Sequence, residues 1–329
     1  MKLLILGGTK FLGRHVATQA LAQGHQVTLL HRGLSGPTLF PEAEHLIADR
    51  DADLSVLEHR AWDAVVDTSA YFPRQVRAVT AKLVGRVGHY HFVSSISAYA
   101  DFENGGSDEA APVASLVDPS VKVVNGETYG GLKALCEQAA QAALGERCLI
   151  SRPGLIVGPF DPTGRFTWWV QRVARGGDVL APGKPESPVQ FIDARDIAAW
   201  TLLQAERGNA GVYNLNGPSR PLTMQTFLDT AREALQPSAN LVWVDEAFLA
   251  DQGVAAWSDM PVWLPTESAA MHRTPTAKAQ ATGLVCRPLR ETLVDTLTWC
   301  EESQEPQHPG VGLTAEREAS LLAAWRERP

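Results

Sequence analysis

The sequence is poor in the patterns that mark disulfide-rich and membrane proteins. Its 4 cysteines, at positions 136, 148, 286 and 300, lie far apart and form no C-x-x-C pair, which disfavours a zinc site or a disulfide framework and suits a reducing cytoplasm. No apolar run approaches the roughly 20 residues that span a bilayer. The apolar start MKLLIL is too short for a signal peptide. We therefore expect a cytoplasmic protein that does not bind a membrane.

Metal-ligand spacing is also missing from the chain. The 9 histidines show no recurrent ligand pattern. His89 and His91 alternate along a predicted strand, and this arrangement favours one exposed face over a pair of ligands. We therefore expect no bound metal, and we place these two histidines on the surface of the strand.

Positive charge is scarce relative to negative charge. The chain has 29 Lys and Arg against 37 Asp and Glu, a formal net charge of −8 and a pI near 5.6. Nucleic-acid-binding proteins are more often basic, because their partner is a polyanion. The hydrophobic share of 45% and the charged share of 20% are those of an ordinary globular protein. We expect a small-molecule substrate and no nucleic-acid partner.

Short apolar runs alternate with helical patterns through the first half of the chain. The runs cover residues 2–6, 26–30, 44–48, 64–67, 89–94 and 147–152, and the helical patterns cover 11–22, 73–83 and 130–143. Short buried strands that alternate with helices indicate parallel β-α-β units. The pattern predicts an α/β fold, a Rossmann-type doubly wound parallel sheet with helices on both faces, mainly in residues 1–160.

The second half of the chain differs from the first in its proline and tryptophan content. Prolines cluster after Arg152, and eight of the 9 tryptophans follow position 150. Helical patterns recur at 196–205, 223–235, 289–302 and 313–328. We predict a smaller mixed substrate lobe over 161–305, interleaved with the last Rossmann elements at about 189–216. A Pro-rich linker, 305–310, and a C-terminal helix complete the chain, so that 306–329 forms a separate tail.

The stretch GGTKFLG, Gly7 to Gly13, has the context of a phosphate-binding loop. It follows a predicted strand and opens a predicted helix. Glycines let the backbone approach a pyrophosphate, and the helix start offers free N–H groups. A P-loop would need Lys-Ser/Thr after Gly13, whereas Arg14 and His15 follow. The stretch predicts dinucleotide binding, with Lys10 adding charge; a turn without a ligand is the alternative.

The end of the second predicted strand bears on the choice of cofactor. NAD enzymes place an acidic residue there for the ribose 2′-hydroxyl, but this chain reads Leu30-His31-Arg32-Gly33. Arg32, helped by Lys10, suits a 2′-phosphate instead, because guanidinium matches phosphate in charge and geometry. We predict NADP in preference to NAD, although both residues are also consistent with solvated surface charges.

A third motif joins Tyr129 and Lys133, which are four residues apart and share one face of a predicted helix. A Tyr hydroxyl, with a reference pKa of about 10, becomes a better base when a nearby ammonium lowers its pKa. A Ser hydroxyl can hold the substrate oxygen while Tyr exchanges its proton. We predict Tyr129 as the acid/base and Lys133 as the residue that tunes it. A resemblance to the Ser–Tyr–Lys triad of the short-chain dehydrogenase/reductases implies Ser95 as the orienting hydroxyl; Ser94 is the rival, with cofactor support as its other role.

Taken together, GGTKFLG, the Ser-Ser strand end and Y-x-x-x-K resemble the short-chain dehydrogenase/reductases, in particular extended, atypical members of the NAD-dependent epimerase/dehydratase family. The resemblance runs from Met1 to about Leu235 and implies pairing of two subunits through the triad-bearing helices. It also implies that Asp196 ties structure together. The implied cofactor contacts are Gly7, Thr9, Lys10, Phe11, Leu12, Gly13, Arg32, Asp49, Arg50, Thr68, Ser69, Ala70, Ser94, Tyr129, Lys133, Pro153, Gly154 and Ile156.

Three departures from the family pattern narrow the function. Ser95-Ile96-Ser97 stands where sugar-nucleotide dehydratases carry Thr-Asp-Glu, which disfavours water elimination. Val189 stands where many members place an Arg for a sugar-nucleotide diphosphate, and 71–83 lacks the Asn of a proton relay. The predicted substrate contacts are Gln190, Arg165 and Trp168. Arg172 and Arg175 are alternatives to Arg165, and all three arginines also suit a helix surface; Trp169, Trp257 and Trp263, like Trp168, suit either a pocket wall or the core.

Three functions remain open from the sequence. The first is an NAD(P)-dependent oxidoreductase or epimerase that transfers hydride at a hydroxyl or carbonyl carbon with Tyr acid/base catalysis. The second is an NADP-dependent carbonyl reductase of a substrate that is not a nucleotide. The third, from another class, is a non-catalytic member that senses nucleotides or binds RNA; the intact Ser95, Tyr129 and Lys133 set argues against it.

Overall fold

The computed structural model describes residues 1–102, 106–218, 220–303 and 310–328. Its largest element is a seven-stranded sheet in the order β11-β6-β5-β4-β1-β2-β3, and every neighbouring pair is parallel. The strands are β1 (Lys2–Leu6), β2 (Gln26–His31), β3 (Glu44–Ile47), β4 (Trp62–Asp67), β5 (Val87–Val93), β6 (Cys148–Pro153) and β11 (Gly211–Leu215). The predicted Rossmann-type fold is confirmed.

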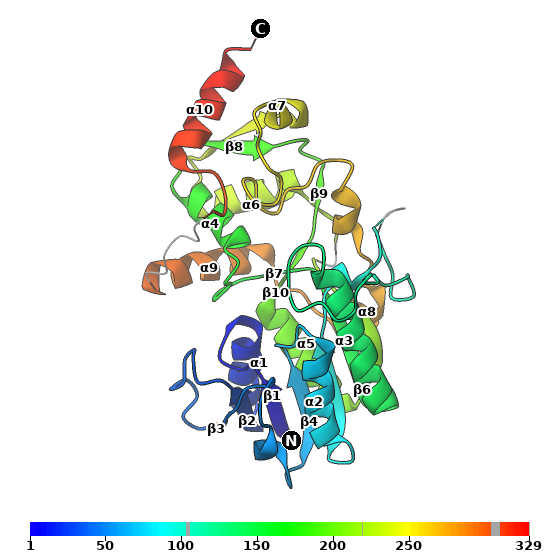
Figure 1. The fold of residues 1–329 in the computed structure, drawn as a ribbon. Coiled ribbons are helices and arrows are strands. Elements are labelled where there is room, and N and C mark those ends of the chain that lie inside the picture. The colour runs from blue at the N-terminus through cyan, green and yellow to red at the C-terminus, as the bar shows by residue number, and fades with distance from the viewer. Residues whose placement is uncertain (103–105, 219, 304–309, 329) are drawn as a thin grey trace.

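Helices cover both faces of this sheet (Figure 1). Leu3 and Ile5 of β1 pack against α1 (Phe11–Ala22) and α5 (Ala194–Arg207). The alternate residues Leu4 and Leu6 pack on the opposite face, against α2 (Pro73–Leu83) and α3 (Tyr129–Leu144). Because successive side chains of a strand point to opposite faces, a strand buried on both faces is apolar throughout. This explains the unbroken run Leu3 to Leu6.

A second lobe follows the sheet and lies above it in Figure 1. Its core packs Phe166, Trp169 and Phe227 around α4 (Arg165–Ala174), α6 (Met224–Leu235), α9 (Leu289–Ser303) and α10 (Ala315–Arg326). Three small sheets pair β7 (Leu155–Val157) with β10 (Phe191–Asp193), β8 (Asp178–Pro182) with β13 (Asn240–Val244), and β9 (Pro188–Val189) with β12 (Leu222–Thr223). The shorter helices are α7 (Glu246–Asp251), α8 (Ala277–Ala281), η1 (Ser55–Leu57), η2 (Ile96–Ala98), η3 (Gly145–Arg147) and η4 (Ala269–Arg273).

The boundary between sheet and lobe differs in detail from the predicted one. Strand β11, late in the chain, closes the edge of the main sheet beside β6, whereas β10 pairs with β7 outside it. The predicted linker lies, apart from Gly310, outside the described residues. Within the described ranges, no helix is long and apolar enough to cross a membrane.

The prediction that His89 and His91 occupy an exposed face is wrong. His91 is fully buried and His89 is only 2% exposed, because β5 lies inside the sheet beneath helices. The Nε2 atom of His91 lies 2.8 Å from Ser151 Oγ, and its ring meets Trp200 of α5 edge-on. Burial lowers the pKa of His91 to about 3, so this ring is a neutral core residue.

Candidate active site and cofactor-binding edge

The glycine loop follows β1 and packs closely on the loop that follows β4. Gly7 has a φ of +98°, and a Cβ there would lie 2.9 Å from Ser69 Cβ and Thr68 Oγ1. A Cβ at Gly13 would lie 2.7 Å from the carbonyl oxygen of Gly7. Side chains at either position would therefore fill the cradle, and only glycine leaves the backbone free to approach a ligand.

The start of α1 is open to an anion. Lys10 is the N-cap residue, its side chain makes no capping hydrogen bond, and the first turn has no acidic residue. The helix dipole and the leading N–H groups favour negative charge at such an end. Thr9 is buried and Lys10 is exposed. The loop and the helix start together fit a dinucleotide pyrophosphate.

Two arginines predicted as cofactor contacts lie in different environments. Arg32 is exposed after β2, and among the described residues its side chain has no hydrogen bond or ion pair. Arg50 is buried and forks onto both carboxylate oxygens of Asp67, with Nη1 at 2.7 Å from Oδ1. Only Arg32 presents a free guanidinium. Asp49 is exposed and accepts a hydrogen bond from the N–H of Asp51.

Asp67 is the centre of a buried network that the sequence did not indicate. Tyr90 donates its hydroxyl hydrogen to Asp67 Oδ2 at 2.7 Å. Burial acts to raise the pKa of Asp67, but Arg50 and the hydrogen bonds outweigh it, and the pKa lies below its usual range. Arg50 also donates to Ser69 Oγ at 3.2 Å, so this network fixes the loop beneath Gly7.

The three predicted catalytic residues meet at the carboxyl ends of β4 and β5. Ser95 follows β5, Tyr129 begins α3, and Lys133 lies one turn further along. The hydroxyl of Ser95 lies close enough to Tyr129 to act on the pKa of its phenol, which it lowers. Gly130 makes this approach possible, because a Cβ there would lie 2.1 Å from the carbonyl oxygen of Ser97 in η2. The glycine after Tyr129 thus lets α3 rest directly on the segment that carries Ser95.

Lys133 is buried beneath the site. Its Nζ donates to the carbonyl oxygens of Val93 at 2.7 Å and Ala70 at 3.1 Å. An ammonium has three hydrogens, so one donor remains for a ligand such as a ribose hydroxyl. Burial lowers the pKa of Lys133 to about 8. The loop of Thr68, Ser69 and Ala70 and the end of β5 therefore position this amine.

The expectation that Lys133 lowers the pKa of Tyr129 is corrected by the structure. Burial raises the pKa of Tyr129, and the hydroxyl of Ser95 offsets this only in part. Tyr71 lies beside it, with ring centroids 6.3 Å apart, and acts in the same direction as burial. The hydroxyl of Tyr129 is therefore protonated at neutral pH.

Ser94 and Ser95 point to different partners. Ser94 donates its hydroxyl hydrogen to Glu137, and Arg152 binds the same carboxylate with Nε at 3.0 Å and Nη2 at 2.6 Å. Glu137 lies one helical turn after Lys133, and the K-x-x-x-E spacing was the available sequence signal for it. This buried pair holds α3 against β6, and Ser95 is the serine that faces Tyr129.

The end of β6 and the segment after it carry three of the predicted cofactor contacts. Pro153 ends β6, and Gly154 follows it against Asn216, whose amide nitrogen would lie 2.3 Å from a Cβ at 154. Ile156 lies in β7. Asn216 donates to Gln190 Oε1 at 2.8 Å, so it joins this segment to the predicted substrate side. No motif in the sequence indicated Asn216.

The remaining substrate-side predictions are dispersed. Gln190 is held by Asn216 and by the backbone of Thr274, to whose carbonyl oxygen it donates at 2.9 Å. Arg165 lies over the ring of Trp257, and Trp168 donates to the carbonyl oxygen of Leu313 at 3.3 Å. Trp168 is thus held by the C-terminal segment.

The expected surface or diphosphate role of Arg172 is wrong. This arginine is buried and pairs with Glu318 of α10, because α10 covers this side of α4. Trp169 and Trp263 lie in the core of the second lobe. Asp196 accepts hydrogen bonds from the backbone and guanidinium of Arg287, at 2.9 and 2.7 Å, which is the structural tie implied by the family resemblance.

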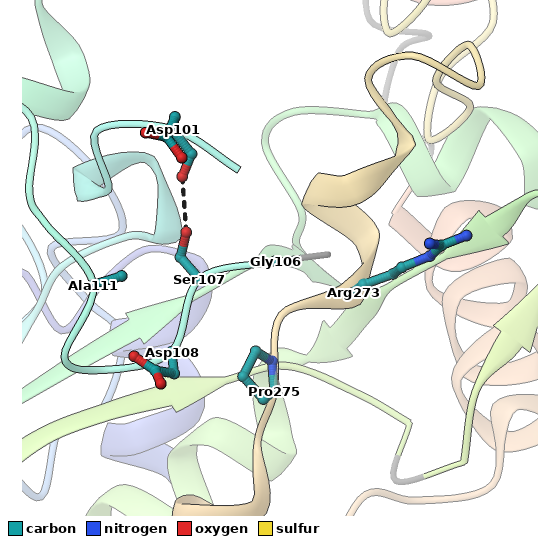
Figure 2. A pocket seen from close by; sticks show the side chains of 7 residues that line it. All are labelled: Asp101, Gly106, Ser107, Asp108, Ala111, Arg273 and Pro275. Carbon is teal, nitrogen blue, oxygen red and sulfur yellow. Dashed lines mark hydrogen bonds between the residues drawn. The ribbon is translucent and has the colours of Figure 1, made fainter. Parts of the chain in front are cut away.

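Two surface hollows lie away from the triad. One, of about 390 Å³, lies between the loop with Asp101 and Ser107 and the segment with Arg273 and Pro275, as Figure 2 shows. The other, of about 600 Å³, borders α3, β6 and β11 on the side of Glu137 and Arg152. Neither is lined by Ser95, Tyr129 or Lys133. No group of three or more His, Cys, Asp or Glu that could hold a metal occurs among the described residues.

Known proteins resemble this chain in both sequence and fold. The chain is 27% identical over 236 residues to a chloroplast stem-loop binding protein of 41 kDa from Arabidopsis thaliana, covering 66% of this chain but only 58% of that relative. It is 25% identical over 249 residues to an isoflavone reductase homolog from Zea mays, covering 69% and 72% of the two chains. UDP-glucose 4-epimerase from Thermotoga maritima shares the fold, with a TM-score of 0.69, 18% identity and coverage of 93% and 100%.

The decisive comparison is with a family model. The model described as NAD dependent epimerase/dehydratase family matches residues 3–215. That range contains the glycine loop, the Ser95, Tyr129 and Lys133 set, and the seven strands of the main sheet except for Lys2, the first residue of β1. The chain therefore belongs to the NAD dependent epimerase/dehydratase family.

Proposed function

We propose that this protein is an NADP-dependent oxidoreductase that reduces a carbonyl compound other than a nucleotide sugar. The observation that carries the proposal is the convergence of Ser95, Tyr129 and Lys133 beside an open phosphate-binding loop. The cofactor, when bound, supplies the hydride. We place the enzyme in the cytoplasm and allow for a homodimer.

In this proposal Tyr129 is the proton donor. Its raised pKa keeps the phenol protonated at neutral pH, the form needed to protonate a carbonyl oxygen as it becomes a hydroxyl. Ser95 donates to that same oxygen and orients it. Lys133 binds the cofactor ribose with the hydrogen that Ala70 and Val93 leave free.

The preference for NADP rests on charge at the end of β2. Arg32 and Lys10 are exposed cations without a described partner, and no carboxylate follows β2 at this point. Val189, where many family members carry an arginine, is an apolar residue only 2% exposed. The resemblance to an isoflavone reductase homolog supports reduction of a substrate that is not a nucleotide.

The test is an equilibrium titration of nucleotide-stripped protein with NADPH and NADH, followed by tryptophan fluorescence, for wild type and Tyr129→Phe. We expect tighter binding of NADPH, and an unchanged dissociation constant in the variant. NADPH oxidation with a panel of carbonyl compounds should fall at least about 100-fold in the variant, because it lacks the proton donor. Preferential binding of NADH would reject the NADP assignment and favour an epimerase with a retained cofactor.

A second function is favoured by one observation, the resemblance to a stem-loop binding protein. A non-catalytic RNA-binding member would bind an RNA stem-loop with the same affinity in wild type and Tyr129→Phe. The net charge of −8 opposes this function, since an RNA partner is itself a polyanion. Failure to bind either nicotinamide cofactor, together with salt-sensitive RNA binding, would favour it over the reductase.

A further inference from the structure

Arg14 is a cation at the start of α1 that neither the motif nor the triad uses. It follows Gly13 directly, and its N–H donates to the carbonyl oxygen of Lys10 at 3.1 Å. Among the described residues its side chain forms no hydrogen bond or ion pair with any acceptor. Burial lowers the pKa of this guanidinium, and no neighbouring carboxylate offsets the effect.

The position of Arg14 is electrostatically unfavourable in the protein alone. Lys10 is the N-cap residue of α1 and Arg14 lies in its first turn, so two cations stand at one end of the helix. Both also lie at the positive end of the helix dipole, where cations are disfavoured, and no acidic residue lies in the first turn. A bound anion would offset these unfavourable interactions, because it attracts both cations and the helix dipole favours it.

The side chain of Arg14 is held in place by an aromatic ring. Its guanidinium carbon lies 3.7 Å from the centroid of Phe160, in the loop that follows β7. His15 lies 5.6 Å from the same ring, and its Nε2 is 2.9 Å from the carbonyl oxygen of Pro159. Helical side chains lean toward the N-terminus of their helix. Stacking on Phe160 therefore holds a preorganised cation near the glycine loop and leaves its N–H groups free to donate.

We propose that Arg14 binds the pyrophosphate of the nicotinamide cofactor, with Phe160 as the platform that positions its guanidinium. This inference rests on the proposed function, because it assumes that a dinucleotide occupies the glycine loop. It separates two cationic contacts: Arg14 binds the pyrophosphate, which NADH and NADPH share, and Arg32 binds the 2′-phosphate, which only NADPH carries.

The experiment compares Arg14→Gln, Arg14→Lys and Arg32→Gln by titration of stripped protein with NADH and with NADPH. Arg14→Gln should weaken binding of both cofactors about tenfold, the effect of losing a charged hydrogen bond, and Arg14→Lys should retain part of the affinity. Arg32→Gln should weaken NADPH alone. The matched control is Arg328→Gln, since Arg328 also stacks on a phenylalanine, Phe248, but in the second lobe.

Thermal unfolding without ligand tells whether Arg14 binds the cofactor or only stabilises the fold by stacking on Phe160. The expected result is that Arg14→Gln unfolds at the wild-type temperature or above it, because the change removes a cation from the positive end of α1. The variant should nevertheless lose affinity for both cofactors. Wild-type affinity in Arg14→Gln, or a loss limited to NADPH, would overturn the inference. So would a lowered unfolding temperature with equal losses in Arg14→Gln and Arg14→Lys. If the wild type itself binds neither cofactor, the proposed function fails first.

Discussion

The ammonium group of Lys133 is buried in the protein interior, where burial disfavours the charged form. The side chain is 4% exposed, and burial lowers its pKa from 10.5 to about 8. Two backbone carbonyls bind the ammonium but do not fully replace the water it has lost. The buried ammonium group one turn from Tyr129 therefore lowers the free energy of unfolding, a cost that is common at functional sites.

This residue should make stability depend on pH in a defined window. Between pH 8 and 10.5 the unfolded chain binds a proton at position 133 that the folded chain has lost, so unfolding becomes less favourable as pH rises. Relative to Lys133→Met, the wild type should gain on the order of 3 kcal/mol across the window. Urea denaturation at pH 7.5, 8.5 and 9.5 covers the lower part of this window, where about 2 kcal/mol of the gain should appear.

The control is Lys184→Met, which removes an exposed lysine of the second lobe and should leave the pH dependence of the wild type intact. A constant difference between wild type and Lys133→Met at all three pH values would contradict the prediction. It would mean that Lys133 titrates alike in the folded and unfolded chains.

Residue types could be predicted from the sequence better than their partners. Tyr129 and Lys133 were found by spacing, because a helix converts spacing into proximity. Arg50 was expected to face the cofactor, yet it turns inward to Asp67, which lies on another strand. Glu137 was missed although Ser94 donates to it. Such pairs depend on tertiary contacts between elements, which no local pattern encodes.

At the scale of elements, the N-terminus of α1 lacks a capping side chain, which favours a bound anion but does not stabilise the helix itself. An N-cap position favours Ser, Thr, Asp or Asn, whose oxygen accepts a backbone N–H. Lys10 occupies this position with extended dihedral angles and caps nothing. The helix start therefore retains free donors and gains positive charge, both of which favour a pyrophosphate at the expense of the unliganded protein.

Replacing Lys10 with serine should weaken binding of the cofactor and raise the free energy of unfolding of the unliganded protein. Lys10→Ser supplies a capping hydroxyl and removes a cation, so the free energy of unfolding without ligand should rise by about 1 kcal/mol. NADPH should bind more weakly, because the new cap competes for the donors. Lys10→Ala removes the same charge without a cap and serves as the control. Equal stability of the two variants in urea denaturation would contradict the capping argument.

Element boundaries show why the fold was predictable. Helix α2 was predicted at 73–83 and occupies Pro73–Leu83, because proline starts a helix well and its apolar residues recur on one face. The second lobe was less predictable. Strands β9 and β12 are only two residues long, and they pair across more than 30 residues of intervening chain. No periodicity is detectable in so short a segment.

At the scale of the whole molecule, the sheet with a core on each face and the second lobe with a core of its own have different roles. The sheet and its helices carry the glycine loop and the triad, whereas the second lobe is built on Phe166, Trp169 and their neighbours. Helix α10 belongs to the core of the second lobe, where Glu318 binds Arg172 and accepts the N–H of Leu180 at 3.0 Å. Stability of this lobe and affinity for the cofactor should therefore respond to different substitutions.

Glu318→Gln tests this division. The change leaves the Arg172 guanidinium buried at 7% exposure without its carboxylate, and breaking one partner of a buried pair costs about 3–5 kcal/mol. Chemical denaturation should register this loss, while the dissociation constant of NADPH, measured under conditions where the variant is folded, should stay that of the wild type. Glu316→Gln, on the exposed side of α10, should change neither. A parallel loss of NADPH affinity in Glu318→Gln would mean that the second lobe directly supports the edge of the sheet that binds the cofactor, and that the sheet and the second lobe act as one unit.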